Sequence, residues 1–131
     1  MNEELRYDFP AISEGDDRRV GPSLAEASFG DTVIEEETLY MDIGGDWKEG
    51  VHGAAIGTVT LTHSPTTIEG RIILHAWFVF DNGETAEYAG LVPGEGSWQG
   101  IGRLGYRGGT GRFADRRGHL EVESTNPKNW R

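Results

Sequence analysis

Cysteine is absent from this chain of 131 residues, which excludes structural disulfides, thiolate metal sites and a cysteine nucleophile. Long apolar runs are also absent, because no stretch approaches the length that crosses a bilayer. The first ten residues, MNEELRYDFP, carry acidic side chains where a signal peptide would have its apolar core. We therefore expect a cytoplasmic protein with no membrane partner.

Basic side chains are few relative to acidic ones. The chain has 12 Lys and Arg against 22 Asp and Glu, and its formal net charge is −10. Such a charge repels phosphate backbones and anionic lipid surfaces, and it also keeps a protein soluble. Nucleic acid is therefore not an expected partner.

Glycine is abundant, with 20 residues and no collagen-like period. Glycines scattered among β-branched and aromatic residues are typical of strands, tight bends and bulges, which indicates an all-β protein. The polar residues 1–21 end at Gly21-Pro22, and we interpret them as an N-terminal arm that is disordered or serves as a lid. Residues 22–131 form the expected β-barrel domain.

At least six strands are expected from apolar periodicity and turn signals. The clearest is GRIILHAWFVFD, which ends at the hairpin signal Asp81-Asn82-Gly83. A meander of strands at hairpin spacing avoids exposed edges most simply by closing into an up-and-down barrel. The expected strands cover residues 31–42, 51–63, 70–81, 84–92, 97–107 and 116–124.

Residues 100–105, GIGRLG, match the G-x-G-x-x-G fingerprint of dinucleotide-binding turns. That turn requires a strand before it and a helix that begins at its last glycine. Glycines at 105, 108, 109 and 111 would break such a helix repeatedly, so we reject the nucleotide interpretation. The glycines instead predict strands that coil and turn tightly.

No cofactor is expected from the pattern of chemically active residues. The four histidines never occur at His-x-His or i, i+4 spacing, so they predict no preformed metal site. No G-x-S-x-G nucleophile elbow occurs either. A cofactor-free site would instead need aromatic side chains that shape a ligand and one or two polar groups.

Residues 108–118, GGTGRFADRRG, resemble the G-G-T-G-x-F-x-x-A-R-G segment of the allene oxide cyclase and dirigent barrels. The chain departs from that segment at Arg116, where the family has alanine. The order of strands is also similar to that of small bacterial polyketide cyclases, including spirotetronate and spirotetramate Diels-Alderases. The resemblance implies a barrel of about eight antiparallel strands with an internal cavity, commonly a homodimer or homotrimer.

The function that this resemblance implies is a cofactor-independent cyclase or isomerase of natural-product biosynthesis, in antibiotic pathways of the polyketide type. It would fold a linear apolar intermediate for cycloaddition or conjugate ring closure, because bringing the reacting ends together removes much of the entropic barrier. Two alternatives remain open: a lipocalin-like carrier of the same kind of ligand, and a dirigent-like protein that guides a coupling.

The candidate site residues are side chains that could line a barrel lumen. Within residues 70–81, His75 and Trp77 share a face of mixed character, which we expect to face the lumen, while Phe78 lies on the apolar face. An inward Glu35 or Glu37 would have a raised pKa and could transfer protons. The predicted catalytic residues are Glu35, His75 and Tyr88, and the predicted substrate-binding residues are Tyr40, Trp77, Phe78, Trp98 and Arg103.

Overall fold

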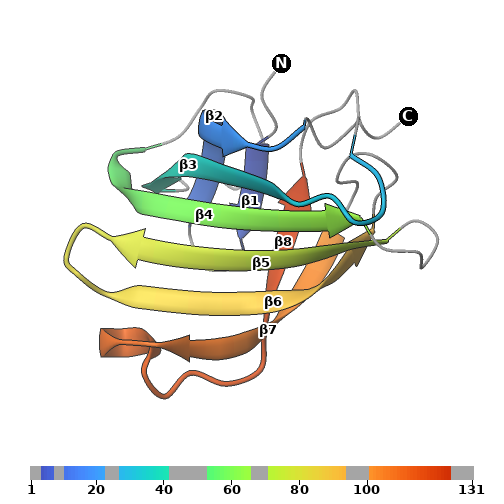
Figure 1. Ribbon diagram of the computed structural model, residues 1–131. Coiled ribbons are helices and arrows are strands. Elements are labelled where there is room, and N and C mark those ends of the chain that lie inside the picture. The colour runs from blue at the N-terminus through green and yellow to red at the C-terminus, as the bar shows by residue number, and fades with distance from the viewer. Residues whose placement is uncertain are drawn as a thin grey trace.

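The computed structural model describes residues 4–7, 11–22, 27–41, 53–65, 71–93 and 101–124. This part of the chain forms eight strands and one short 3-10 turn (Figure 1). The strands are β1 (Glu4–Tyr7), β2 (Ala11–Val20), β3 (Val33–Met41), β4 (Ala55–Pro65), β5 (Arg71–Phe80), β6 (Thr85–Pro93), β7 (Ile101–Gly109) and β8 (His119–Ser124), and the turn is η1 (Gly111–Phe113).

The sheet is a closed antiparallel barrel in which the strands are neighbours in chain order, β1 to β8. Closure comes from β1, which pairs with β8 through Leu5↔Ser124 and Tyr7↔Val122. Closure gives every described strand a partner on each side, which leaves no free sheet edge among them. The prediction of an all-β, up-and-down barrel is therefore confirmed.

The six expected strands correspond to β3 through β8, and the expected hairpin joins β5 to β6. The backbone N–H of Gly83 donates to the carbonyl of Phe80 over 2.9 Å, and the N–H of Phe80 donates to the carbonyl of Glu84 over 2.9 Å. Gly83 has φ +91°, a left-handed conformation that glycine adopts without steric cost. The Asn-Gly signal thus determines where β5 reverses.

The N-terminal arm expected over residues 1–21 is wrong for most of its length, because residues 4–7 and 11–20 are strands of the barrel wall. β2 pairs with β3 from Ala11↔Met41 to Val20↔Ile34, with a register shift between Glu14 and Arg18. The polar sequence of β2 gives little strand signal, and its Arg18 and Val20 lie in register with Glu36 and Ile34 on the outer face of β3. The local preference of these residues for strand is weak, and pairing with β3 makes them a strand nevertheless.

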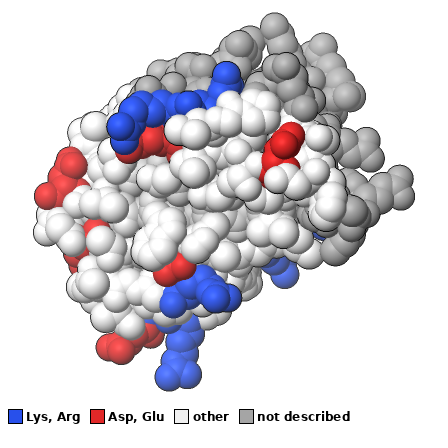
Figure 2. All heavy atoms as spheres, in the orientation of Figure 1, with Lys and Arg blue, Asp and Glu red and all other residues white. Residues whose placement is uncertain are grey.

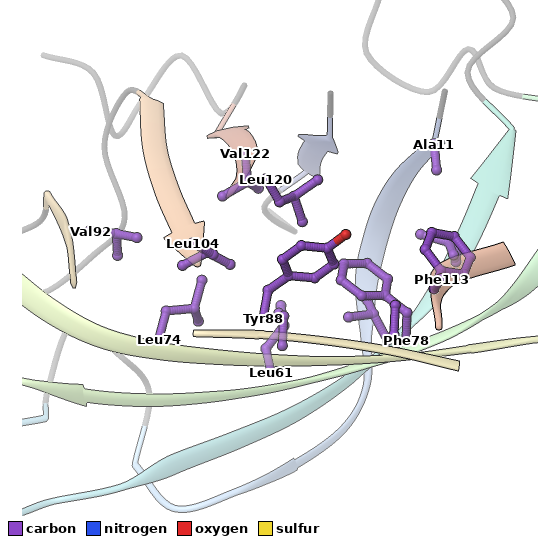
Figure 3. Packing of buried hydrophobic residues seen from close by; sticks show 14 of the residues in the cluster. Ala11, Leu61, Leu74, Phe78, Tyr88, Val92, Leu104, Phe113, Leu120 and Val122 are labelled. Carbon is purple, nitrogen blue, oxygen red and sulfur yellow. The ribbon is translucent and has the colours of Figure 1, made fainter. Parts of the chain in front are cut away.

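The core lies inside the barrel and is built from alternate positions of the strands. Along β5 the even-numbered side chains are buried and the odd-numbered ones are exposed or half-buried. Figure 3 shows inward side chains from several strands meeting around Tyr88. The buried set includes Leu39, Val59, Leu61, Leu74, Phe78, Tyr88, Leu104, Leu120 and Val122.

The glycine-rich segment after residue 100 forms β7 and the 3-10 turn, so no helix follows the G-x-G-x-x-G letters. Phe113 of that turn is 2 % exposed and stacks on Phe80 with ring centroids 5.2 Å apart. A Cβ on Gly109 would lie 2.8 Å from the Cβ of Phe113, closer than real side chains approach. The lack of a side chain at Gly109 therefore leaves space for Phe113, which packs into this end of the barrel. No helix of the described residues is long and apolar enough to cross a membrane.

Candidate functional site

Two glutamates of β3 point into the barrel, on the face that also carries Val33 and Leu39. Glu37 is 2 % exposed, and its Oε1 accepts a hydrogen bond of 2.7 Å from the Ser13 hydroxyl of β2. The side chain of Glu35 is 14 % exposed. Removing a carboxylate from water costs free energy. The hydrogen-bond partners of a carboxylate in the apolar lumen therefore contribute to the stability of the protein or to its function.

His63 is the second polar group of the lumen, and it lies near the end of β4, opposite Val33. It is 1 % exposed, and burial lowers its pKa to about 4, so the imidazole is neutral near pH 7. Among the residues that the structure describes, neither ring nitrogen has a hydrogen-bond partner. Its Nε2 lies 3.9 Å from Oε2 of Glu35, too far for a hydrogen bond.

A buried imidazole without partners costs roughly 1–3 kcal/mol of stability, and such a group in a protein calls for an explanation. A bound ligand with a carbonyl or hydroxyl group would supply the missing partner. The N–H of a neutral imidazole can polarise a carbonyl oxygen, and the neighbouring carboxylate can accept a proton. We call His63 and Glu35 the lumen pair.

Sequence reasoning named Glu35 but considered His63 only as one histidine without metal-ligand spacing. The signal that could have found it is the period-two pattern of β4, in which Val59, Leu61 and His63 occupy the same face. Once Val59 and Leu61 are assigned to the core, His63 must follow them inward.

Tyr88 and Phe78, both predicted site residues, lie in the middle of the lumen and are 0 % exposed. Their rings meet edge to face, with centroids 6.1 Å apart and an interplanar angle of 82°. Tyr106 of β7 also contacts Tyr88, at 5.7 Å between centroids. Figure 3 shows the Tyr88 hydroxyl among core side chains, so this aromatic cluster is part of the packed interior of the lumen.

The expectation that His75 and Trp77 line the lumen is wrong, because both lie on the outer face of β5. Nε2 of His75 lies 2.5 Å from Oε2 of Glu87, and its ring stacks on Trp77 at 5.3 Å. Trp77 is 45 % exposed. The apolar face of β5 points inward instead, because burying its five apolar side chains removes more apolar surface from water than burying the mixed face would.

Arg103 and Tyr40 also lie outside the lumen. Nε of Arg103 pairs with Oε2 of Glu121 at 3.1 Å, and both side chains are well exposed. Tyr40 is half-buried on the outward face of β3, in register with Ala55 of β4. Trp98, the remaining candidate, falls outside the described residues. Among the predicted site residues that the structure describes, Glu35, Tyr88 and Phe78 are the ones that face the interior.

A cavity of about 530 Å³ opens at the opposite end of the barrel, where β4 begins and β5 ends. We call it the mouth cavity. Apolar side chains make most of its wall, and the stacked rings of Phe80 and Phe113 lie at its edge. Its lining is Ala11, Met41, Ala55, Ile56, Phe80, Asp81, Asn82, Arg112, Phe113 and Arg116.

Arg112 is fixed at the rim of the mouth cavity by several contacts. Its guanidinium lies over the rings of Phe80 and Phe113, at 5.1 and 4.8 Å from their centroids. It also pairs with Glu84, through Nε at 3.0 Å and through the backbone N–H at 2.6 Å. That backbone hydrogen bond, followed by one from Asn82, lowers the pKa of the Glu84 carboxyl. Sequence reasoning did not identify Arg112.

The lumen pair and the mouth cavity lie far apart. Ile56 and His63 sit near opposite ends of β4, and at ~3.3 Å per residue they are separated by roughly 23 Å along the strand. Inward side chains including Val59, Leu61 and Phe78 occupy the lumen between them. The protein therefore has two candidate ligand sites, one polar and one apolar.

No group of three or more His, Asp or Glu side chains within the described ranges is arranged to hold a metal ion. Comparisons of the chain with protein-family models, with curated proteins and with solved structures found no match.

Proposed function

We propose that the protein is a cofactor-independent isomerase or cyclase that acts on a largely apolar small molecule at the lumen pair. The observation that carries this proposal is the buried, neutral imidazole of His63, whose ring nitrogens have no hydrogen-bond partner in the described structure. A chain selected for stability alone would gain by replacing such a group with leucine. Retention of an unsatisfied group at a cost in stability is typical of functional sites.

The chemistry of this site follows from the states of the two side chains. The N–H of His63 donates a hydrogen bond to a carbonyl oxygen of the substrate and stabilises the negative charge that develops there during ring closure or enolisation. Glu35 removes a proton from the substrate and returns it at another atom, so the mass of the product is unchanged. Tyr88 and Phe78 provide the rigid wall against which a flexible chain would fold.

The test uses the full chain and linear polyenes that end in tetronate, tetramate or β-keto groups. Chromatography with mass detection should show a new peak of unchanged mass that forms faster with native than with heat-denatured protein. His63→Leu should abolish this rate enhancement while the protein stays folded, and the control His119→Leu, at an exposed position of β8, should keep it. Equal turnover by the two variants would contradict the assignment.

A carrier is the second candidate, and the mouth cavity favours it, because an apolar cavity of this size suits a small ligand without any acid–base group. A ligand that raises the melting temperature but yields no new peak would support the carrier. In that case Ile56→Asp, in the cavity wall, should weaken binding and His63→Leu should not. The two variants therefore distinguish a reaction at the lumen pair from ligand binding in the mouth cavity.

A further inference from the structure

The mouth cavity has two sides of different chemistry. Strands β2, β3 and β4 contribute apolar side chains to its wall, among them Met41 and Ile56. The hairpin between β5 and β6 and the segment after β7 contribute the polar ones, which are Asp81, Asn82, Arg112 and Arg116. Its volume of about 530 Å³ lies within the range of small-molecule sites, roughly 300–1,000 Å³. A ligand that matches both sides has an apolar body and a polar end.

The rings of Phe80 and Phe113 form a flat part of the cavity wall. They stack with an interplanar angle of 8° and with centroids 5.2 Å apart. Most of the surface of both rings is buried in the barrel, so the wall is rigid and loses little conformational entropy when a ligand binds. Aromatic rings pack best on other aromatic rings. The apolar body of the ligand is therefore expected to be flat and conjugated.

The charge near the mouth cavity differs from that of the whole chain. The formal net charge is −10, but residues 110–118 contain three arginines and one aspartate. On the face shown in Figure 2, basic side chains gather in a few groups separated by uncharged surface, so the net charge does not describe each region. Arg112 and Arg116 line the cavity, and Asp81 is the one carboxylate among the described lining residues. The lining therefore attracts an anion more than a cation.

Arg112 and Arg116 are placed to hold a carboxylate. The guanidinium of Arg112 lies over the stacked rings, and its Nε pairs with Glu84 at 3.0 Å. Within the described part of the chain, its two terminal Nη groups have no hydrogen-bond partner. Cζ of Arg116 lies 5.7 Å from the centroid of Phe113, so both guanidinium groups lie near the same ring. A guanidinium stacked on a ring directs its N–H groups sideways, where they can donate in pairs to the two oxygens of a carboxylate.

We propose that the mouth cavity binds a flat, conjugated carboxylic acid in its ionised form, with the ring against Phe80 and Ile56 and with the carboxylate accepting hydrogen bonds from Arg112 and Arg116. The ligand is held, and none of its bonds changes. The proposal deepens the carrier alternative, because it names the ligand class of the mouth cavity and rests on that cavity being a binding site. It makes no use of the lumen pair.

The test is calorimetric titration of the full chain near pH 7, where carboxylic acids are ionised, with three probes of similar size. The probes are naphthoate, its neutral amide naphthamide, and the saturated acid decahydronaphthoate. Naphthoate should bind roughly tenfold or more tightly than naphthamide, because hydrogen bonds to charged groups contribute more than those to neutral groups. Decahydronaphthoate keeps the carboxylate but lacks a flat ring, so it should bind more weakly than naphthoate. No binding of naphthoate, or equal affinity for naphthoate and another probe, would overturn the proposal.

Four variants locate the bound probe. Arg116→Gln should weaken naphthoate binding roughly tenfold and leave naphthamide binding unchanged. The control is Arg117→Gln, at the next and exposed position outside the described lining, which should change neither. Asp81→Asn should tighten naphthoate binding because it removes a repulsive carboxylate, and Ile56→Asp should weaken binding of all three probes. Equal effects of the two arginine variants, or weaker binding of naphthoate after Asp81→Asn, would contradict an anion site.

This proposal and the catalytic one fail separately. His63→Leu should leave the affinity for naphthoate unchanged, because the lumen pair lies at the other end of β4. A loss of naphthoate binding in that variant would place the probe at the lumen pair and overturn the proposal. A native chain that forms the product of unchanged mass but binds no naphthoate would overturn this proposal alone. One that binds naphthoate but forms no product would contradict the catalytic proposal alone.

Discussion

Both faces of β5 carry several apolar side chains, five on the inward face and three on the outward face, yet they have different environments. The inward face carries Ile72, Leu74, Ala76, Phe78 and Phe80, all between 0 and 5 % exposed. The outward face carries Ile73, Trp77 and Val79, close to half exposed, with His75 among them. The inner face is therefore packed by the chain itself, while the outer face is in contact with solvent. The difference shows that several large apolar side chains on a strand face do not by themselves make that face part of the core.

The largest expected effect separates the two faces directly. Phe78→Ala should lower the free energy of unfolding by about 3–5 kcal/mol, because it removes a buried ring and leaves a cavity beside Tyr88. Trp77→Ala, one residue away on the outer face, should lower the free energy of unfolding by under about 1 kcal/mol. Urea denaturation of both variants checks the comparison. Similar losses at the two positions would mean that the outer face is as tightly packed as the inner one.

A smaller effect tests the polar part of the interior by its dependence on pH. The folded pKa of His63 is about 4, below the unfolded value of 6.5, so the unfolded chain binds the proton first as pH falls. Stability from the neutral imidazole is complete above pH 6.5 and is lost as the pH falls through about 4. At ~1.36 kcal/mol per pKa unit, this loss is on the order of 3 kcal/mol.

His63→Leu should remove that loss, and the stability difference between variant and native protein should grow from pH 7 to pH 4. Urea unfolding at the two pH values measures it, and the other titrating groups largely cancel in the difference. Glu35, whose Oε2 lies 3.9 Å from His63, is the group most able to disturb the cancellation, so Glu35→Gln is the matched background. A difference that is the same at both pH values would contradict burial of a neutral imidazole.

The smallest effect concerns an exposed ion pair. Arg103→Ala should change the free energy of unfolding by under about 1 kcal/mol, because its pair with Glu121 is solvated and screened by salt. Turnover or ligand binding at the lumen should also be unchanged, since Arg103 points away from the interior. Denaturation and the product assay with this variant check both statements. A large loss of activity would restore Arg103 as a site residue.

Much of the fold could be predicted from local signals. The turn at Asn82-Gly83, the alternation within β5 and the failure of any helix after Gly105 all depend on residues near one another in sequence. β1 and β2 could not be predicted this way, since β2 is polar and is held by its pairing with β3. Part of the candidate site was predictable too: Glu35, Phe78 and Tyr88 were identified, while His63 and the mouth cavity were not.

The sequence by itself determined that the chain is all-β, where six of its strands run and which side chains share a face of each strand. The tertiary structure alone decided which of the two faces points inward. Alternation has a period of two, so a strand with apolar side chains on both faces satisfies it in either orientation. Closure of the barrel resolved the choice, because the lumen could be filled from only one face of each strand. That choice placed His63 and Glu35 inside and His75, Trp77 and Arg103 outside.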